Sequence, residues 1–216
     1  MIRSALLSGS PFMPLLLFDF DGVIIDSFGI LYQSALEAYP DLGTIEEYRR
    51  LFEGNIYTSA EDKKGNKDTI TIEHPVFSRY IPRMLDRPPV HGMVPLLHEI
   101  TETTSAVVVS SCLTESIKEY SHRYGFPNAF GAIYGADVEK SKERKMHLAL
   151  TAYDRQPHEA VMITDTLGDL REAANVGVPT IAVTWGFHSQ ETLERGNPNH
   201  IVHSPDELRR AILRGI

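Results

Sequence analysis

The sequence predicts an α/β protein in which helices sandwich an open parallel sheet and a small helical cap is inserted after the first strand. Two observations predict this fold. Short apolar runs alternate with segments of helical periodicity, which is typical of parallel sheets with right-handed crossovers. In addition, the gap between the first two runs is far too long for a single crossover and has helical periodicity of its own.

Five apolar runs are predicted to be strands, each followed by polar, acidic or glycine residues. Continuous Val, Ile and Leu runs of this length are typical of strands buried on both faces. The runs are 15–18, 106–109, 132–134, 160–163 and 180–183. Helical periodicity is found at 94–100, 115–124, 143–153, 167–176 and 205–213.

The long gap predicts the inserted cap. Its helix-like stretches are 30–39, 45–52 and 76–85, the last interrupted by Pro82. A charged stretch with glycine and asparagine at 61–68 predicts a loop, and two prolines at 88–89 return the chain to the sheet. We therefore expect a cap at 28–88, an α/β core at 13–27 and 89–216, and a loose N-terminal extension at 1–12.

Composition limits the classes of function. The 216 residues contain 21 Lys and Arg against 29 Asp and Glu, a formal net charge of −8, which argues against nucleic-acid binding. No apolar run approaches membrane-spanning length, so no membrane association is expected. The single cysteine, Cys112, cannot form an internal disulfide, which favours a reducing, cytoplasmic location.

The end of the first predicted strand carries the first candidate site. Asp19 and Asp21 follow the strand directly, and Gly22 lets the backbone approach a ligand closely. Two crowded carboxylates favour a cation, and Mg²⁺ prefers oxygen ligands. The alternative is an acidic turn that merely ends a strand.

A second acidic site follows the strand at 160–163. Asp165 comes at the strand end, and Asp169 stands four residues later at the start of a helix. Taken alone, Asp169 could simply be an acidic residue at a helix N-terminus that interacts favourably with the helix dipole. Two acidic strand ends in one parallel sheet lie at the same edge, however, so Asp165 can join Asp19 in one metal site.

Hydroxyl and lysine side chains could bind an anion at this edge. Ser110 and Ser111 follow the strand at 106–109, where a hydroxyl and the amides that open a helix make a phosphate cradle, although serine also caps helices routinely. Lys140 and Lys142 stand near the start of a helix, where the helix dipole makes a cation unfavourable. Their position therefore suggests that one of them has another role, such as neutralising a phosphate. The alternative for these lysines is a solvated charged face.

Together these motifs resemble the haloacid-dehalogenase-like superfamily, whose core is Rossmann-like. Residues 19–27 are similar to its first motif, Ser110 to the second, and 164–169 to the fourth, although Thr164 stands where many members carry glycine. Residues 178–186 resemble the corresponding segment of phosphoglycolate-phosphatase-like members. For the third motif, Lys140 fits a Lys-Pro-x-Pro-like register that lacks both prolines, and Lys142 fits a Ser-Lys-x-x-Lys register, which we prefer.

The resemblance implies a magnesium-dependent phosphatase that acts on a small phosphorylated molecule. Asp19 would attack phosphorus to form an aspartyl-phosphate, and Asp21 would act as general acid and base. The implied metal site comprises Asp19, the backbone carbonyl of Asp21, Asp165 and Asp169. The implied phosphate site comprises Gly22, Ser110, Ser111 and Lys142, with Lys140 as the alternative lysine.

Several questions stay open at this point. A phosphomutase of the same fold, a receiver-like signalling domain and a catalytically silent binding protein are the competing hypotheses. The presence of Asp21 argues against dehalogenation, and a monomer or weak homodimer is expected. In the cap, four side chains could reach a substrate, but each is as well explained as a surface or packing residue. They are His74, Arg79, Tyr80 and Arg83.

Overall fold

A computed structural model describes residues 13–57 and 71–214. These residues form an α/β sandwich around a six-stranded sheet with the order β3-β2-β1-β4-β5-β6, in which every neighbouring pair is parallel. The predicted fold class is therefore confirmed. The strands are β1 Leu15–Phe18, β2 Ala106–Val109, β3 Ala132–Tyr134, β4 Ala160–Thr164, β5 Thr180–Val183 and β6 His200–Val202.

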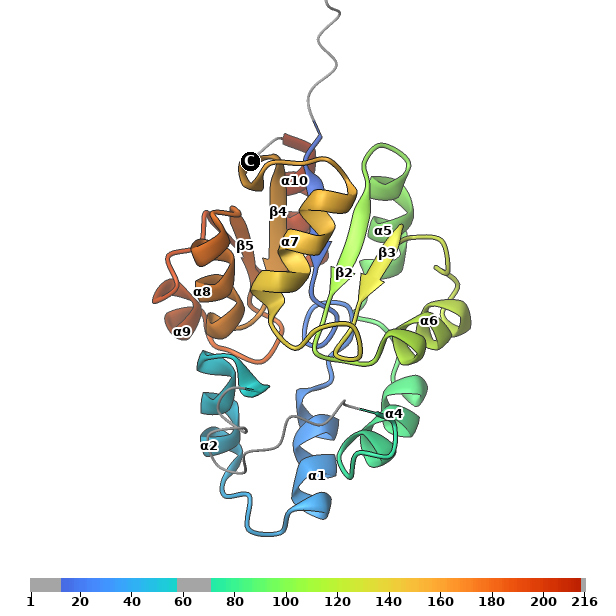
Figure 1. The fold of residues 1–216 in the computed structure, drawn as a ribbon, viewed down its shortest axis with the longest axis vertical. Helices are drawn as coiled ribbons and strands as arrows, with labels where there is room; N and C mark the ends of the chain where they lie inside the picture. Colours follow the sequence, from blue (N-terminus) through green and yellow to red (C-terminus); the bar gives the residue numbers. More distant parts are fainter. Residues whose placement is uncertain (1–12, 58–70, 215–216) are drawn as a thin grey trace, which may run out of the picture.

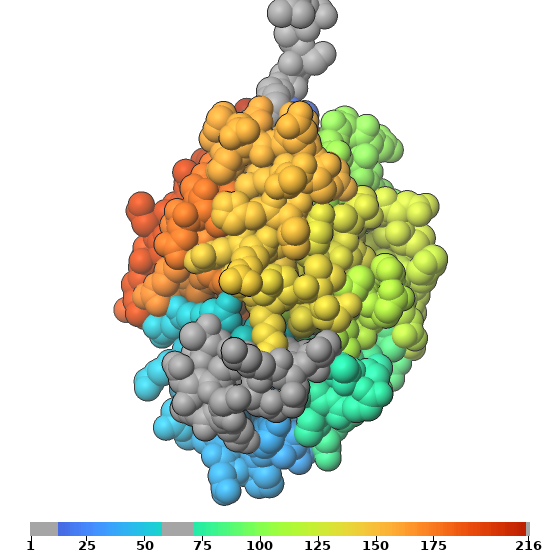
Figure 2. Space-filling model, viewed as in Figure 1, coloured from blue at the N-terminus to red at the C-terminus, as the bar shows by residue number. Residues whose placement is uncertain are grey.

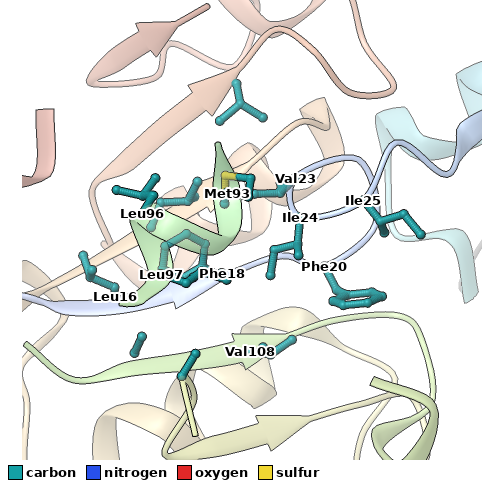
Figure 3. Packing of buried hydrophobic residues seen from close by; sticks show 14 of the residues in the cluster. Leu16, Phe18, Phe20, Val23, Ile24, Ile25, Met93, Leu96, Leu97 and Val108 are labelled. Atoms are coloured by element: carbon teal, nitrogen blue, oxygen red, sulfur yellow. The ribbon is translucent and has the colours of Figure 1, made fainter. Parts of the chain in front are cut away.

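The strand sequences form a sheet because both faces of the sheet are covered. Along β1, Leu16 and Phe18 pack on one face, while Leu15 and Leu17 pack on the other, as the two-residue period of a strand requires. Figure 3 shows the first of these clusters, where Leu96 and Leu97 meet β1. All four β1 side chains are at most 1% exposed.

Helices cover both faces of the sheet. In Figure 1, α7 and α8 lie in front of the sheet, and α5 and α10 lie behind it. The helices outside the insertion are α5 Met93–Thr101, α6 Thr114–Arg123, α7 Lys142–Ala152, α8 Leu167–Val176, α9 Gln190–Glu194 and α10 Pro205–Arg214, with a 3₁₀ turn at Pro157–Glu159. None of the helices in the described ranges has the length and hydropathy needed to cross a membrane.

The structure adds a strand and an α-helix that the sequence patterns did not predict. Strand β6 has three residues and lies at the edge of the sheet, where His200 is exposed, so it lacks the continuous apolar run of a central strand. Helix α9 has only five residues. By contrast, four of the five predicted strands match the observed bounds, and the fourth extends by one residue to Thr164.

The inserted segment, residues 28–88, forms helices at the carboxyl end of the sheet. They are α1 Phe28–Ala38, α2 Ile45–Arg50, the 3₁₀ turn η1 Leu51–Glu53 and α4 Phe77–Asp86. Figures 1 and 2 show these residues, in blue to green, at one end of the molecule. Helix α4 continues through Pro82, since Tyr80, Ile81 and Met84 anchor it by burial. The predicted extension at 1–12 and the predicted loop at 61–68 lie outside the described residues.

The two connections to the inserted segment are held together. Ile25, which precedes the segment, forms an isolated antiparallel bridge with Pro89, which follows it. The amide of Val90 also donates to the carbonyl of Ile24 at 2.8 Å. The chain therefore leaves and re-enters the core at a single point beside the carboxyl end of β1.

Candidate active site

Three adjacent strands bring the predicted polar residues together. β2, β1 and β4 are neighbours in the sheet, and their carboxyl ends lead directly into Ser110, Asp19 and Asp165. The loop after β1 is tight, because the amide of Ile24 donates to the carbonyl of Phe20 at 2.9 Å. Parallel register, not proximity in sequence, therefore assembles this edge.

Lys142 connects two of the acidic residues. Its Nζ donates to Asp19 Oδ2 at 2.7 Å and to Asp169 Oδ2 at 2.6 Å. The Ser141 side chain caps α7 and makes Lys142 the first helical residue. Burial alone would lower the pKa of Lys142, but Asp169 and Asp19 outweigh it and hold the pKa above the ordinary lysine value. The lysine is therefore a fixed cation between two buried carboxylates.

The two carboxylates respond to this cation differently. Burial raises the pKa of Asp19 well above its ordinary value, and Lys142 offsets only part of that effect. Burial also acts on Asp169, but there Lys142 and the hydroxyl of Thr164, which donates to Oδ2 at 2.6 Å, bring the pKa below its ordinary value. Asp169 is therefore the better stabilised anion of the pair. Thr164, which stands where many members of the resembled family carry glycine, thus has a role in this site.

Asp165 is the least satisfied acidic residue. Its Oδ2 accepts from the amide of Phe187 at 2.7 Å, but its buried Oδ1 has no hydrogen-bond partner among the residues that the structure describes. Burial raises the pKa of Asp165 to about 8. Two glycines make room for it, because a Cβ on Gly22 would lie 1.8 Å, and one on Gly186 2.2 Å, from Asp165 Oδ2. The chain approaches this carboxylate too closely for any side chain.

The arrangement fits a hard cation beside Asp165. A buried carboxylate oxygen without a partner is costly unless a cation or donor compensates it, and carboxylates with a backbone carbonyl are ligands suited to Mg²⁺. Within the described ranges, no three His, Cys, Asp or Glu side chains already converge as a metal site. We attribute this to Lys142, which draws the Oδ2 atoms of Asp19 and Asp169 toward its ammonium group.

Asp21 is held by the inserted segment as well as by the core. Its Oδ1 accepts from the hydroxyl of Ser27 at 2.7 Å and from the phenol of Tyr80 in α4. Burial raises the pKa of Asp21, and the two hydroxyl bonds lower it in part. Gly22 follows with φ +77°, a left-handed conformation that turns the chain away from the sheet.

The serine turn after β2 is rigid. Ser110 is fully buried, and its Oγ accepts from the amide of Cys112 at 3.0 Å. The carbonyl of Ser110 accepts from Nζ of Lys145 at 2.5 Å, and the carbonyl of Ser111 accepts from the phenol of Tyr57 at 2.8 Å. The sequence patterns predicted both serines, and Lys145 is the second lysine of the Ser-Lys-x-x-Lys register, but no pattern assigned a role to Lys145 or to Tyr57.

Other contacts attach the inserted segment to the core near Asp165. The Arg49 guanidinium lies over the Phe28 ring at 4.1 Å and donates to the carbonyl of Phe187. The carbonyl of Arg49 is 3.1 Å from Nε2 of His188. Because the amide of Phe187 also holds Asp165, α2 connects to this carboxylate through one residue.

The remaining predicted residues lie elsewhere or play other parts. Lys140 is half-buried, and its backbone amide donates to Glu139. Arg83 pairs with Glu37 at 2.8 Å, and Arg79 donates to the carbonyl of Pro75. Of the four candidates in the inserted segment, Tyr80 is the one that the structure brings to Asp21.

Comparison with known proteins identifies relatives of this chain in sequence and in fold. The family model described as "Haloacid dehalogenase-like hydrolase" matches residues 16–183. A phosphoglycolate phosphatase of Synechococcus elongatus is 24% identical over 93% of this chain and 97% of its own. A predicted phosphatase from Clostridium acetobutylicum is 24% identical, with a TM-score of 0.79 over 95% of this chain and 100% of its own. CbbY from Rhodobacter sphaeroides, solved as a mutant with xylulose-(1,5)bisphosphate, is 20% identical, with a TM-score of 0.72 over 91% of this chain and 96% of its own. The two structures show likeness of fold.

Proposed function

We propose a specific phosphatase chemistry for this chain, which belongs to the haloacid dehalogenase-like hydrolase family. Its family and its phosphoglycolate-phosphatase relatives make it a hydrolase of phosphomonoesters. Beyond that, we propose that it is Mg²⁺-dependent, that Asp19 attacks the phosphorus of a small substrate, and that an aspartyl-phosphate then forms and is hydrolysed.

The bridge from Lys142 to Asp19 and Asp169 is the observation that carries this proposal. A cation fixed beside Asp19 favours the ionised form of the nucleophile against the effect of burial, and it can stabilise the charge that develops on a phosphoryl group. The buried Ser110 hydroxyl and the amide of Ser111 lie on the neighbouring strand end, where they can bind phosphoryl oxygens. The attacking and stabilising groups thus share one edge.

Mg²⁺ would be held by Asp19, the backbone carbonyl of Asp21, and Asp165 with support from Asp169. When bound, it would supply positive charge that neutralises the substrate phosphate. The orphaned Oδ1 of Asp165 is the strongest support for this assignment in the chain itself.

Asp21 is the proposed general acid and base. Its Oδ1 is occupied by the hydroxyls of Ser27 and Tyr80, which leaves Oδ2 for proton transfer. In the first step Asp21 protonates the leaving oxygen while Asp19 bonds to phosphorus. In the second, Asp21 takes a proton from the water that attacks the aspartyl-phosphate, which restores both carboxyl groups.

We also propose that the inserted segment is a cap domain that closes over the site. Tyr80 contacts Asp21, Tyr57 contacts the serine turn, and Arg49 contacts Phe187, so three parts of the segment reach the carboxyl edge. A closed cap would exclude water from the ionic bridge and strengthen it.

Release of inorganic phosphate tests the proposal. The substrates are phosphoglycolate, xylulose 1,5-bisphosphate, a nucleoside monophosphate and p-nitrophenyl phosphate, each with Mg²⁺ and with EDTA. We expect Mg²⁺-dependent release that Asp19→Asn abolishes while its thermal unfolding stays like that of the parent. Release that persists in Asp19→Asn contradicts the nucleophile, and isomerisation of a sugar phosphate without release indicates a phosphomutase instead.

A further inference from the structure

A second lysine contacts the serine turn of the proposed phosphate site. Lys145 is 0% exposed and follows Lys142 by three residues, so both project from one face of α7. Its Nζ donates to the carbonyl of Ser110 at 2.5 Å. A fully buried lysine is rare unless it is paired, and the mechanism above does not use this one.

The charges around Lys145 come from its own helix and from two further elements. Lys142, on the same helix, repels its ammonium form, whereas Asp19 after β1 and two acidic residues of α8, Asp169 and Glu172, attract it. Burial has the largest effect, and together these influences lower the pKa of Lys145 to about 7. The side chain is thus poised between its neutral and charged forms near neutral pH.

The position of Lys145 also gives it a structural task. The Ser110 carbonyl that it binds belongs to the residue whose hydroxyl is proposed to bind phosphate, and that hydroxyl is itself fixed by the amide of Cys112. Lys145 therefore contacts the main chain of the serine turn and not its hydroxyl. A negative charge bound at the Ser110 hydroxyl would favour the ammonium form of this lysine.

We propose that Lys145 is a second lysine of the phosphate site, which positions Ser110 and takes up a proton when a phosphoryl dianion binds. The inference rests on the proposed phosphatase function. The proton goes from solvent to the amine Nζ, and no covalent bond to the ligand is formed. A dianion at the Ser110 hydroxyl would raise the pKa of Lys145, since a nearby opposite charge shifts a pKa by about one to three units, and the lysine would then be mostly charged at neutral pH.

The direct test is proton uptake on binding of tungstate, an oxyanion that stays a dianion through the neutral range. Calorimetric titration with saturating Mg²⁺, at about pH 8 in two buffers of different ionisation enthalpy, gives the number of protons taken up. We expect more than about half a proton per tungstate for the parent, near zero for Lys145→Met, and the parent value for Lys118→Met. Lys118 is an exposed lysine on α6 that pairs with Glu115.

The outcomes separate this inference from the proposed function. Tungstate binding without proton uptake in the parent overturns the role of Lys145, whether or not Lys145→Met folds. Equal uptake in the parent and Lys145→Met also overturns it. If tungstate does not bind to the parent at all, the phosphate site and the inference fail together.

Kinetics distinguishes positioning from a merely structural role. Because Lys145 acts on the ground-state phosphate site, Lys145→Met should raise KM by about tenfold or more and change kcat less. Lys145→Arg, which keeps a charge and a donor, should recover part of the loss. A uniform fall in kcat in both variants, with unchanged KM, contradicts the proposal.

Discussion

Replacing Lys142 by Met tests the electrostatic core of the site without any assumption about substrate. Methionine has a similar length and no charge, so it keeps the packing of α7 but leaves Asp19 and Asp169 facing each other. Their side chains are 5% and 8% exposed, and that of Lys142 is 6% exposed, so little solvent is present to compensate. The substitution therefore isolates the charge.

The structure sets the size of the effect. Removing one partner of a buried ion pair costs about 3–5 kcal/mol, because the remaining charge is buried without compensation. Here two carboxylates, at 2.7 Å and 2.6 Å from Lys142 Nζ, lose the same partner. One of them can bind a proton and become neutral, which limits the total cost. We expect Lys142→Met to lose about 3–5 kcal/mol of unfolding free energy at about pH 8.

The pH dependence gives a sharper test. In the parent the pKa of Asp169 is lowered, so its contribution to stability exists above the unfolded pKa and is lost as the pH falls through the folded one. The pKa of Asp19 is raised, so its ionised form opposes folding at neutral pH and stability returns on acidification. Without Lys142, the pKa of Asp169 should be raised like that of Asp19, so that its ionised form also opposes folding at neutral pH. The difference in unfolding free energy between parent and variant should therefore narrow as the pH falls. It narrows by about 1.4 kcal/mol for each pH unit over which the folded variant has one more bound proton than the folded parent.

Urea unfolding of parent and variant between about pH 5 and 8, in EDTA so that no divalent cation replaces the ammonium, measures both quantities. Lys118→Met, which removes an exposed lysine, is the matched control and should unfold like the parent. If the unfolding free energies of parent and Lys142→Met differ by less than about 1 kcal/mol at pH 8, Lys142 is not the cation that compensates these carboxylates. A difference that widens on acidification refutes the same assignment.

Two further substitutions test the residues around this bridge. A Cβ on Gly186 would lie 2.2 Å from Asp165 Oδ2, so Gly186→Ala should displace this carboxylate. The Mg²⁺ concentration for half-maximal activity should then rise by about tenfold or more. The control is Gly29→Ala, whose Cβ would meet no described atom within 4 Å and which should leave this concentration unchanged. An unchanged Mg²⁺ requirement contradicts Asp165 as a ligand. Tyr80→Phe removes one of the two hydroxyls that bind Asp21 and should lower the rate of hydrolysis of an alkyl phosphate by about tenfold or more. The rate with p-nitrophenyl phosphate should fall less, because its leaving group needs less protonation. Equal losses on both substrates contradict a role through Asp21.

The central sheet was predictable because burial on both faces imposes a simple pattern. The run 15–18 is apolar throughout and is β1 in the structure, between two other buried strands. The edge strand β6 was not predicted, since an edge strand needs no apolar run and His200 is exposed. The inserted helices were predicted to within a few residues, but patterns of three to five residues, such as α9, fall below what periodicity can detect.

The acidic residues of the site were predictable because they follow strand ends, which parallel register brings together. The choice between Lys140 and Lys142 was not settled by sequence, since both fit a family-like register. In the structure Lys142 begins α7 and contacts Asp19, although the two residues are 123 positions apart in the chain. The contact from Tyr80 to Asp21 spans 59 residues and depends on how α4 docks, which no local pattern contains.

These long-range contacts explain how a mobile cap would control the chemistry. Ser27 is the core residue that precedes α1, whereas Tyr80 lies in α4, so one of the two hydroxyls on Asp21 comes from the segment that would move. Arg49 reaches Asp165 through Phe187 in the same way. Lys142 and Asp169, in contrast, belong to core helices and are bonded to each other whatever the cap does. Opening should therefore leave the phosphate-binding charge in place while it releases the acid from its orientation. A phosphoryl group could then bind to an open form, but proton transfer would wait for closure.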